Sequence, residues 1–318
     1  MQINRGLIFW GVGLVTAGVV ALAVQQGFVD RDALTGAWRL WPIVLIAIGL
    51  AIIVSRTPFA LLGTIVAGLV VGAGAGVLIS VGPGLATCGG HEPTSTTTRD
   101  GAFTGNEATI DLNFSCGTLE VGLTDSEGWR VVTGETGDDE ALIDATDTTL
   151  VVRSPSRAFM SGEERWDVDL GDALTYTLSV SANAATSTLD LAGGSFTDLS
   201  VNPNAGSLTL DLQGTAVEAL DLSMNAGSTA ILVNETTDLE GTLATNAGSI
   251  ELCAAPGTAL RITVQANLTF SHDLEDSDLV QSDSTWTSAG FEGADHHVDL
   301  HLEGNAASFS LNPEEGCT

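Results

Sequence analysis

The chain has 318 residues, and its 40 acidic residues outnumber ten basic ones, giving a formal net charge of −30. Residues 1–83 contain two of the acidic residues and four of the Arg residues, so residues 84–318 keep 38 acidic residues against six Arg, a net charge of −32. A domain this acidic does not bind nucleic acid or an anionic lipid surface by charge attraction.

Residues 1–83 contain three apolar runs, and we expect them to form membrane-spanning helices at about residues 7–25, 40–55 and 59–81. The third run is long enough to cross roughly 30 Å of hydrocarbon. Arg5 and Arg56 would then lie in the cytoplasm, as the positive-inside rule prefers. The sequence thus predicts a multi-pass protein of the cytoplasmic membrane, in contact with the lipid bilayer, with residues 84–318 extracytoplasmic.

Two features of these runs leave alternatives open. Arg5, the first apolar run and Ala21-Leu22-Ala23 also resemble a cleaved signal peptide. In the third run, Gly68, Gly72 and Gly76 are spaced four residues apart, which allows another helix to approach closely. That helix would belong to the same chain, to a homo-oligomer or to a partner.

A 21-residue repeat follows a linker at residues 84–105. The tetrapeptide Asn-Ala-Gly-Ser begins at Asn204, Asn225 and Asn246, one repeat apart each time. A fixed period of this length is typical of a solenoid, in which each repeat stacks on its neighbours. The predicted turn positions are Asn183, Asn204, Asn225, Asn246, Asn267 and Asn305, and the pattern around Asn113 suggests one more.

The residues on both sides of each Asn alternate between apolar and polar, as in Leu199, Val201, Leu208 and Leu210. This period of two predicts two short strands per turn, joined at a tight corner. Stacked Asn side chains would bond to one another along the axis. We therefore expect residues 106–318 to form an all-β parallel β-solenoid with about 21 residues per turn, an irregular part at 125–175 and an acidic insert at 271–290. A plain antiparallel sandwich is the alternative.

The four Cys residues all follow the apolar runs. They are Cys88, Cys116, Cys253 and Cys317. An even number of Cys in an oxidising compartment predicts two disulfides, and four Cys allow three connectivities. We favour Cys88–Cys116 and Cys253–Cys317, one bond at each end of the solenoid. Zinc is the alternative, although the chain has no Cys-x-x-Cys spacing.

The segment Trp41-Pro42 to Leu50, together with Arg5-Gly6-Leu7-Ile8, resembles the LiaI/LiaF-type transmembrane region. The repeats resemble the adhesin type of repeat domain, similar to the LiaF C-terminal domain, which is a β-solenoid. The first resemblance covers the chain as far as the end of the second apolar run, and the second rests on the repeated Asn-Ala-Gly-Ser. The resemblance implies a role in bacterial envelope-stress signalling, in which LiaF-type proteins restrain a membrane histidine kinase. The third apolar run departs from that family's pattern.

His297, Asp299 and His301 are the candidate metal ligands, because alternate residues of a strand share one face. A polar outer face is the competing interpretation. The acidic insert lacks the spacing of an EF-hand loop. No pair of carboxylates stands out as catalytic, and aromatic platforms for sugars are scarce, so the sequence predicts no enzyme and no cofactor.

These observations predict a membrane-anchored extracytoplasmic module of the cell envelope that binds or senses a partner, without binding nucleic acid. The partner would be a membrane sensor kinase, as in LiaF-like regulation, or a cell-wall component. A surface adhesin or structural solenoid is the first alternative. A polysaccharide-active β-helix enzyme is the last.

Overall fold

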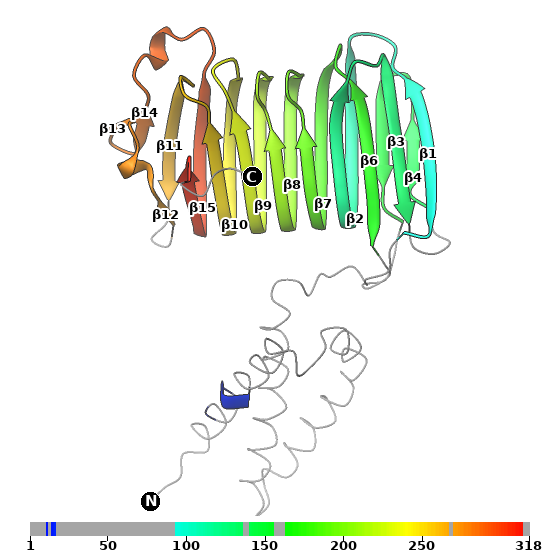
Figure 1. The fold of residues 1–318 in the computed structure, drawn as a ribbon, viewed down its shortest axis with the longest axis horizontal. Helices are drawn as coiled ribbons and strands as arrows, with labels where there is room; N and C mark the ends of the chain where they lie inside the picture. Colours follow the sequence, from blue (N-terminus) through cyan, green and yellow to red (C-terminus); the bar gives the residue numbers. More distant parts are fainter. Residues whose placement is uncertain are drawn as a thin grey trace, which may run out of the picture. The chain divides into compact units, whose positions relative to one another are not determined.

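A single sheet of 15 strands forms most of the second of two structural units, Met1–Leu85 and Ala86–Thr318 (Figure 1). The computed structural model describes residues 11, 14–16, 93–135, 140–155, 163–266 and 270–313. The strands are β1 (Ser95–Ala102), β2 (Glu107–Thr124), β3 (Gly128–Glu135), β4 (Leu142–Ala145), β5 (Thr149–Arg153), β6 (Glu164–Gly171), β7 (Thr175–Asp190), β8 (Ser195–Asp211), β9 (Ala216–Val233), β10 (Asp238–Ala254), β11 (Leu260–Ala266), β12 (Ser271–His272), β13 (Val280–Ser282), β14 (Thr285–Thr287) and β15 (Val298–Leu311). Two short 3-10 helices, η3 (Leu274–Asp276) and η4 (Phe291–Gly293), precede β13 and β15.

The repeats form β7, β8, β9 and β10, which pair in parallel with each residue opposite its counterpart in the next repeat. Each repeat is one strand that continues through the Asn corner, rather than the two short strands that we expected from the sequence. The reason is that stacked repeats bend at the same place. Their backbones therefore stay within hydrogen-bonding distance through the bend.

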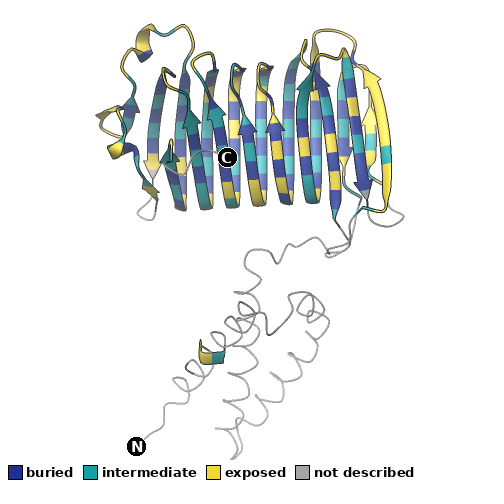
Figure 2. Cartoon of the chain, in the orientation of Figure 1, coloured by how far each residue is buried: buried dark blue, intermediate teal, exposed yellow. Residues whose placement is uncertain are grey.

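Buried positions alternate with half-buried and exposed ones along the strands (Figure 2). The buried apolar residues on both sides of the corner form the core. Leu199, Val201, Leu208 and Leu210 of β8 are all buried, with at most 2% of their surface exposed. Pro203 is also buried, and the other residues between them are half-buried or exposed. This alternation positions a polar outer face on each half of the sheet.

The last strand departs from chain order. β15 lies between β10 and β11 and pairs in parallel with both. Asn305 of β15 therefore lies beside Asn246, because the neighbouring pairs join Thr245 to Gly304 and Ala247 to Ala306. Asn267 lies outside the described residues.

β2 is inserted in a similar way at the other end. One edge of β2 pairs with β7, and the other pairs with β5 along its first half and with β6 along its second. The register corrects the sequence analysis, because Phe114 and Cys116 pair with Ala182 and Ala184, which leaves Ser115 beside Asn183. Asn113 lies two residues earlier. A shift of two residues preserves an alternating pattern, so alternation alone did not reveal the error.

The ends of the sheet are antiparallel rather than parallel. β1 pairs with β3 and β3 with β6 at one end, and β11, β14 and β13 pair successively at the other. β1 lies inside the segment that we expected to be a linker. The irregular part contains β3 to β6, and the acidic insert contains β12, η3, β13 and β14.

The three membrane-spanning helices expected in residues 1–83 are not supported. Within this segment only residues 11 and 14–16 are described, and they are helical. Among the described residues, no helix has the length and apolar character needed to cross a bilayer. The multi-pass topology is corrected accordingly. Apolar composition indicates where a chain avoids water, but it does not by itself establish an uninterrupted helix. The rest of the predicted spans, with Gly68, Gly72 and Gly76, lies outside the described residues.

Candidate functional site

The outer face formed by the first halves of β9, β10, β15 and β11 contains two hollows, one of which extends to β8. One, of about 570 Å³, lies along the Asn corner and is lined by Ser223, Asn225, Asn246, Glu303 and Asn305 among others. The other, of about 560 Å³, lies farther along the same strands and includes Glu240, Arg261, Asp299 and His301. Both hollows are lined mainly by polar side chains, so this face is the candidate binding surface.

The corner hollow is bordered by a ladder of Asn side chains. The side-chain Nδ2 of Asn204 donates to Oδ1 of Asn183 at 2.6 Å, and Asn225 donates to Asn204 in the same way. Asn246 donates to Asn225 and Asn305 donates to Asn246, both at 2.9 Å. The five side chains are exposed. An Asn amide has two N–H donors and an acceptor oxygen with two lone pairs, so such a ladder can both donate to and accept from a ligand.

Thr245 adds a buried polar group to this hollow. Its side chain is 4% exposed, and its hydroxyl has no hydrogen-bond partner in the structure. The equivalent residue of β9 is Met224, which is also buried and also lines the hollow. A buried hydroxyl without a partner is costly, so a ligand or water that reached it would recover a hydrogen bond.

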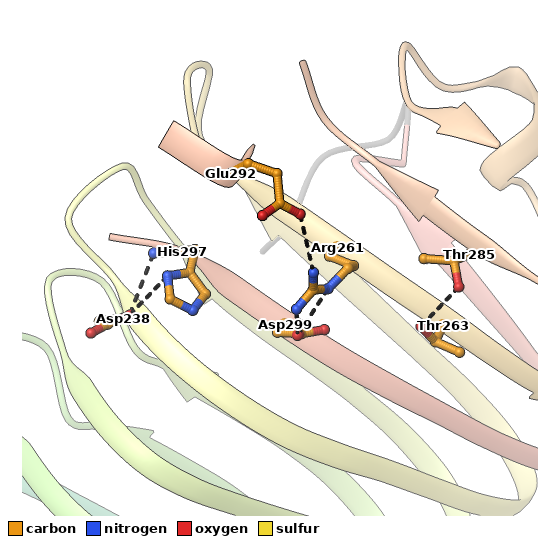
Figure 3. Close-up of polar contacts among 7 residues, drawn as sticks. All are labelled: Asp238, Arg261, Thr263, Thr285, Glu292, His297 and Asp299. Carbon is orange, nitrogen blue, oxygen red and sulfur yellow. Dashed lines mark hydrogen bonds and ion pairs between the residues drawn. The ribbon is translucent and has the colours of Figure 1, made fainter. Parts of the chain in front are cut away.

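The second hollow centres on Arg261, the only Arg after Arg165 in the sequence. Its Nε donates to Oδ2 of Asp299 at 2.9 Å, and a second guanidinium nitrogen donates to the same oxygen (Figure 3). Glu292 lies 3.6 Å from the guanidinium, and the ring of Phe291 lies 4.4 Å from the Arg261 Cζ. The hydrogen bond with Asp299 is the main cause that raises the pKa of Arg261 above its ordinary value. Arg261 is thus a fixed cation on an acidic face.

A β-bulge shapes the wall of the same hollow. Leu239 pairs with Val217, but Gly241 pairs with Leu220, so β9 has one more residue than β10 in this interval. The extra residue places both Glu218 and Ala219 along the hollow. Bulges of this kind redirect side chains and recur near binding sites.

The metal candidates lie on one outer face, but each has a different partner. Nδ1 of His297 lies 3.6 Å from Asp238, and Asp299 binds Arg261 (Figure 3). His301 Nε2 lies 3.3 Å from the side-chain oxygen of Gln265. The described part of the chain contains no group of three or more His, Cys, Asp or Glu side chains arranged to hold a metal ion. Each of the three side chains therefore contacts a different residue from another strand.

Cys116 lies in β2 and Cys253 in β10, and neither is a free thiol. The strands β7, β8 and β9 lie between them, which separates the two Cys residues by at least about 19 Å at ~4.8 Å per strand. A disulfide requires Cα atoms within about 7 Å, so these two residues do not pair with each other. Cys88 and Cys317 lie outside the described residues.

Sequence reasoning missed Arg261, Thr245 and Gln265 as members of the candidate surface. The isolation of Arg261 among acidic residues was a signal that could have identified it. Thr245 had no such signal, because its hydroxyl lacks a partner only in the folded structure.

Two family models match separate segments of the chain. Residues 8–53 match the LiaI-LiaF-like transmembrane region, and residues 91–234 match the N-terminal domain of toast_rack, DUF2154. Neither description names an enzyme. No curated protein matches the chain.

Among solved structures, a candidate cell adhesion protein from Clostridium sporogenes is 11% identical, with a TM-score of 0.42 over 68% of this chain and 99% of that chain. A candidate adhesin from Bacteroides fragilis is 10% identical, with a TM-score of 0.27 over 69% of this chain and 97% of that chain. Both likenesses are too low to transfer a function. The chain is therefore similar to the LiaI-LiaF-like transmembrane region over residues 8–53 and to the toast_rack N-terminal domain over residues 91–234.

Proposed function

We propose that the strand unit is an extracytoplasmic binding or sensing module of a membrane-associated protein in the bacterial cell envelope. The match of residues 8–53 to a transmembrane-region family supports the membrane association. The acidic outer face of the strand unit supports a role in an aqueous compartment, since a net charge far from zero favours solubility.

The observation that carries the binding role is the position of the two hollows on the same four strands. Exposed amides, hydroxyls and carboxylates line them, and Arg261 is held in place by Asp299. The strands hold these side chains at fixed spacings, so a partner meets a preorganised surface and fewer groups have to be ordered on binding. The partner is a protein segment or a cell-wall component that hydrogen-bonds to this face.

The proposal is tested by site-specific photocrosslinking of the full chain in its native membrane. Crosslinking groups at Ser223 and Thr242 lie on the candidate surface, whereas one at Thr209 lies on the outer face of the second strand halves. We expect a defined adduct from Ser223 and Thr242 and little or none from Thr209. Equal yields from all three positions would show that the candidate surface has no special role.

LiaF-like regulation of a sensor kinase is the more specific form of this function, and both family matches favour it. Mass spectrometry of the adduct separates it from the adhesin alternative. A histidine kinase in the adduct supports regulation. Co-sedimentation with purified peptidoglycan, abolished by Thr242→Arg but not by Thr209→Arg, supports attachment to the cell wall instead.

A further inference from the structure

The position of β15 conflicts with the spacing of the repeats. Leu239 of β10 and Leu260 of β11 both pair with Val298 of β15, and they are one repeat length apart in the sequence. Residues that pair directly in β8, β9 and β10 are separated by the same number of residues in the sequence. β11 therefore has the register of a strand that stacks directly on β10, although β15 lies between them.

The outward side chains of β10 and β11, on the two sides of β15, would also be favourable neighbours if the two strands paired directly. Asp299 lies between Glu240 and Arg261, so without β15 the Arg would face a carboxylate again. His301 lies in the same way between Thr242 and Thr263. Opposite charges and paired Thr side chains are favourable neighbours across strands.

The inward residues on the two sides of β15 would also be favourable neighbours. Leu302 separates Leu243 of β10 from Val264 of β11, and all three are buried. Direct contact between Leu243 and Val264 would repeat the packing of Leu222 on Leu243, which is present one repeat earlier. In each of these sets, the residues of β10 and β11 would therefore still be favourable neighbours if the β15 residue between them were removed.

We propose that β15 is an exchangeable strand, and that the sheet has a second closed arrangement in which β11 pairs directly with β10. In this arrangement Leu260–Ala266 occupies the place of the first half of β15, and that first half is released for another contact. The second half is not included, because Ser249 and Ser271 both pair with Ser308 and their separation in the sequence exceeds the repeat length by one position. This inference goes beyond the binding function and does not depend on it.

The arrangement with β15 inserted is the more stable one. Val298, Leu300 and Leu302 in the first half of β15 are buried, with at most 1% of their surface exposed, and release of this half exposes them. The released form is consequently the minor state. Any partner that binds the free strand, and not the inserted one, shifts the balance toward release.

Cysteine pairs in the full chain detect the two arrangements. Thr242→Cys with His301→Cys reports the inserted strand, because the two positions are directly opposite. Thr242→Cys with Thr263→Cys reports direct pairing of β10 and β11. Ser200→Cys with Thr242→Cys is the matched control, because Asp221 of β9 separates these positions by the same two strand steps.

A short thiol-reactive crosslinker is applied, and the linked peptides are mapped by mass spectrometry. We expect the Thr242/Thr263 pair to crosslink several-fold faster than the Ser200/Thr242 control. Equal rates for these two pairs would overturn the proposal, since global unfolding or simple reach would then explain both.

Two charge variants in the background of the Thr242/Thr263 pair add a directional test. Asp299→Asn weakens the inserted strand but leaves Glu240 available to Arg261, so its crosslinking rate should rise by up to about fivefold. Glu240→Gln removes the carboxylate that Arg261 would face in direct pairing and a like charge opposite Asp299 in the inserted strand, so its rate should fall. Hydrogen exchange on the unmodified chain gives a further check, because amides of Val298–Gly304 should exchange before those of β9. Exchange of both sets together would contradict strand release.

Discussion

The carbonyl oxygen of Gly206 lies where a side chain on Gly227 would have to begin. A Cβ on Gly227 would be 2.0 Å from that oxygen, and Gly227 has a φ of 132°. Gly248 repeats the arrangement above Gly227, with a φ of 143° and a Cβ position 2.1 Å from the Gly227 oxygen. The Gly of Asn-Ala-Gly-Ser is therefore required by both the backbone conformation and the close stacking of the repeats.

Replacement of Gly227 by Ala should lower the free energy of unfolding by about 3 kcal/mol or more, because the strained φ and the clash with backbone add together. Denaturant unfolding of the full chain measures the change. Ala185 occupies the equivalent position in β7 and serves as the control. Ala185→Gly should cost only about 1 kcal/mol. Similar losses for both variants would contradict the steric explanation.

The inward and outward rows of β8 are distinguished by adjacent residues. Leu210 is fully buried, whereas Thr209 is half-buried on the outer face. Leu210→Asp should therefore destabilise the domain by roughly 4 kcal/mol or more, since it places a charge in the core. Thr209→Asp should change stability by less than about 0.5 kcal/mol. Thermal unfolding of both variants under one condition tests this difference, which would vanish if the register were wrong.

The only Tyr of the chain gives an alkaline dependence of stability. Burial, with a smaller contribution from Asp172, raises the pKa of Tyr176 from 10.0 to about 12, and its hydroxyl donates to the Gly171 carbonyl at 2.6 Å. The folded state retains this proton longer than the unfolded state, so the contribution is complete below pH 10 and is lost as pH rises to about 12. The loss should be of the order of 2–3 kcal/mol.

Tyrosinate absorbance follows this titration directly, because Tyr176 is the sole Tyr and the chain has no Lys. Tyr176→Phe should remove the tyrosinate signal and flatten the dependence of stability between pH 10 and about 12. A titration midpoint near 10 in the folded protein would show that the side chain is not buried.

The disulfide connectivity is predicted to be Cys88–Cys116 and Cys253–Cys317. Asn312 follows β15, and its side-chain Oδ1 accepts from the backbone N–H of Ala254, so the chain is beside Cys253 just before Cys317. Non-reducing peptide mapping should recover these two pairs. Removal of the second bond by Cys317→Ser should cost about 3 kcal/mol. Recovery of Cys88 linked to Cys253 would contradict the assignment.

The repeat was accessible to sequence reasoning because stacked strands repeat their chemistry at a fixed interval. Leu199, Leu210 and their counterparts are buried where the period of two placed them. The corner was also visible, because Gly206, Gly227 and Gly248 adopt a positive φ that few other residues tolerate. The apolar runs of residues 1–83 were a less reliable guide, since hydropathy indicates avoidance of water and not a particular helix length.

The candidate surface was less accessible, because it depends on strands that are distant in the sequence. His297, Asp299 and His301 share a face as alternation predicts, but their partners are Asp238, Arg261 and Gln265 from other strands. Side-chain partners across strands follow from strand order, which local patterns do not contain. A metal site was therefore a reasonable hypothesis from one strand and an unsupported one from the whole sheet.

The sequence by itself determined the repeat length, the inward rows and the Gly of each Asn-Ala-Gly-Ser corner, because these depend on a residue and its near neighbours. Tertiary structure alone decided that β15 lies between β10 and β11, and that Ser115 rather than Asn113 lies beside Asn183. The physical reason is that a parallel strand can pair with either edge of a stack in the same register. Chain order and local pattern are consistent with either edge, and only the packing of the complete core selects one of them.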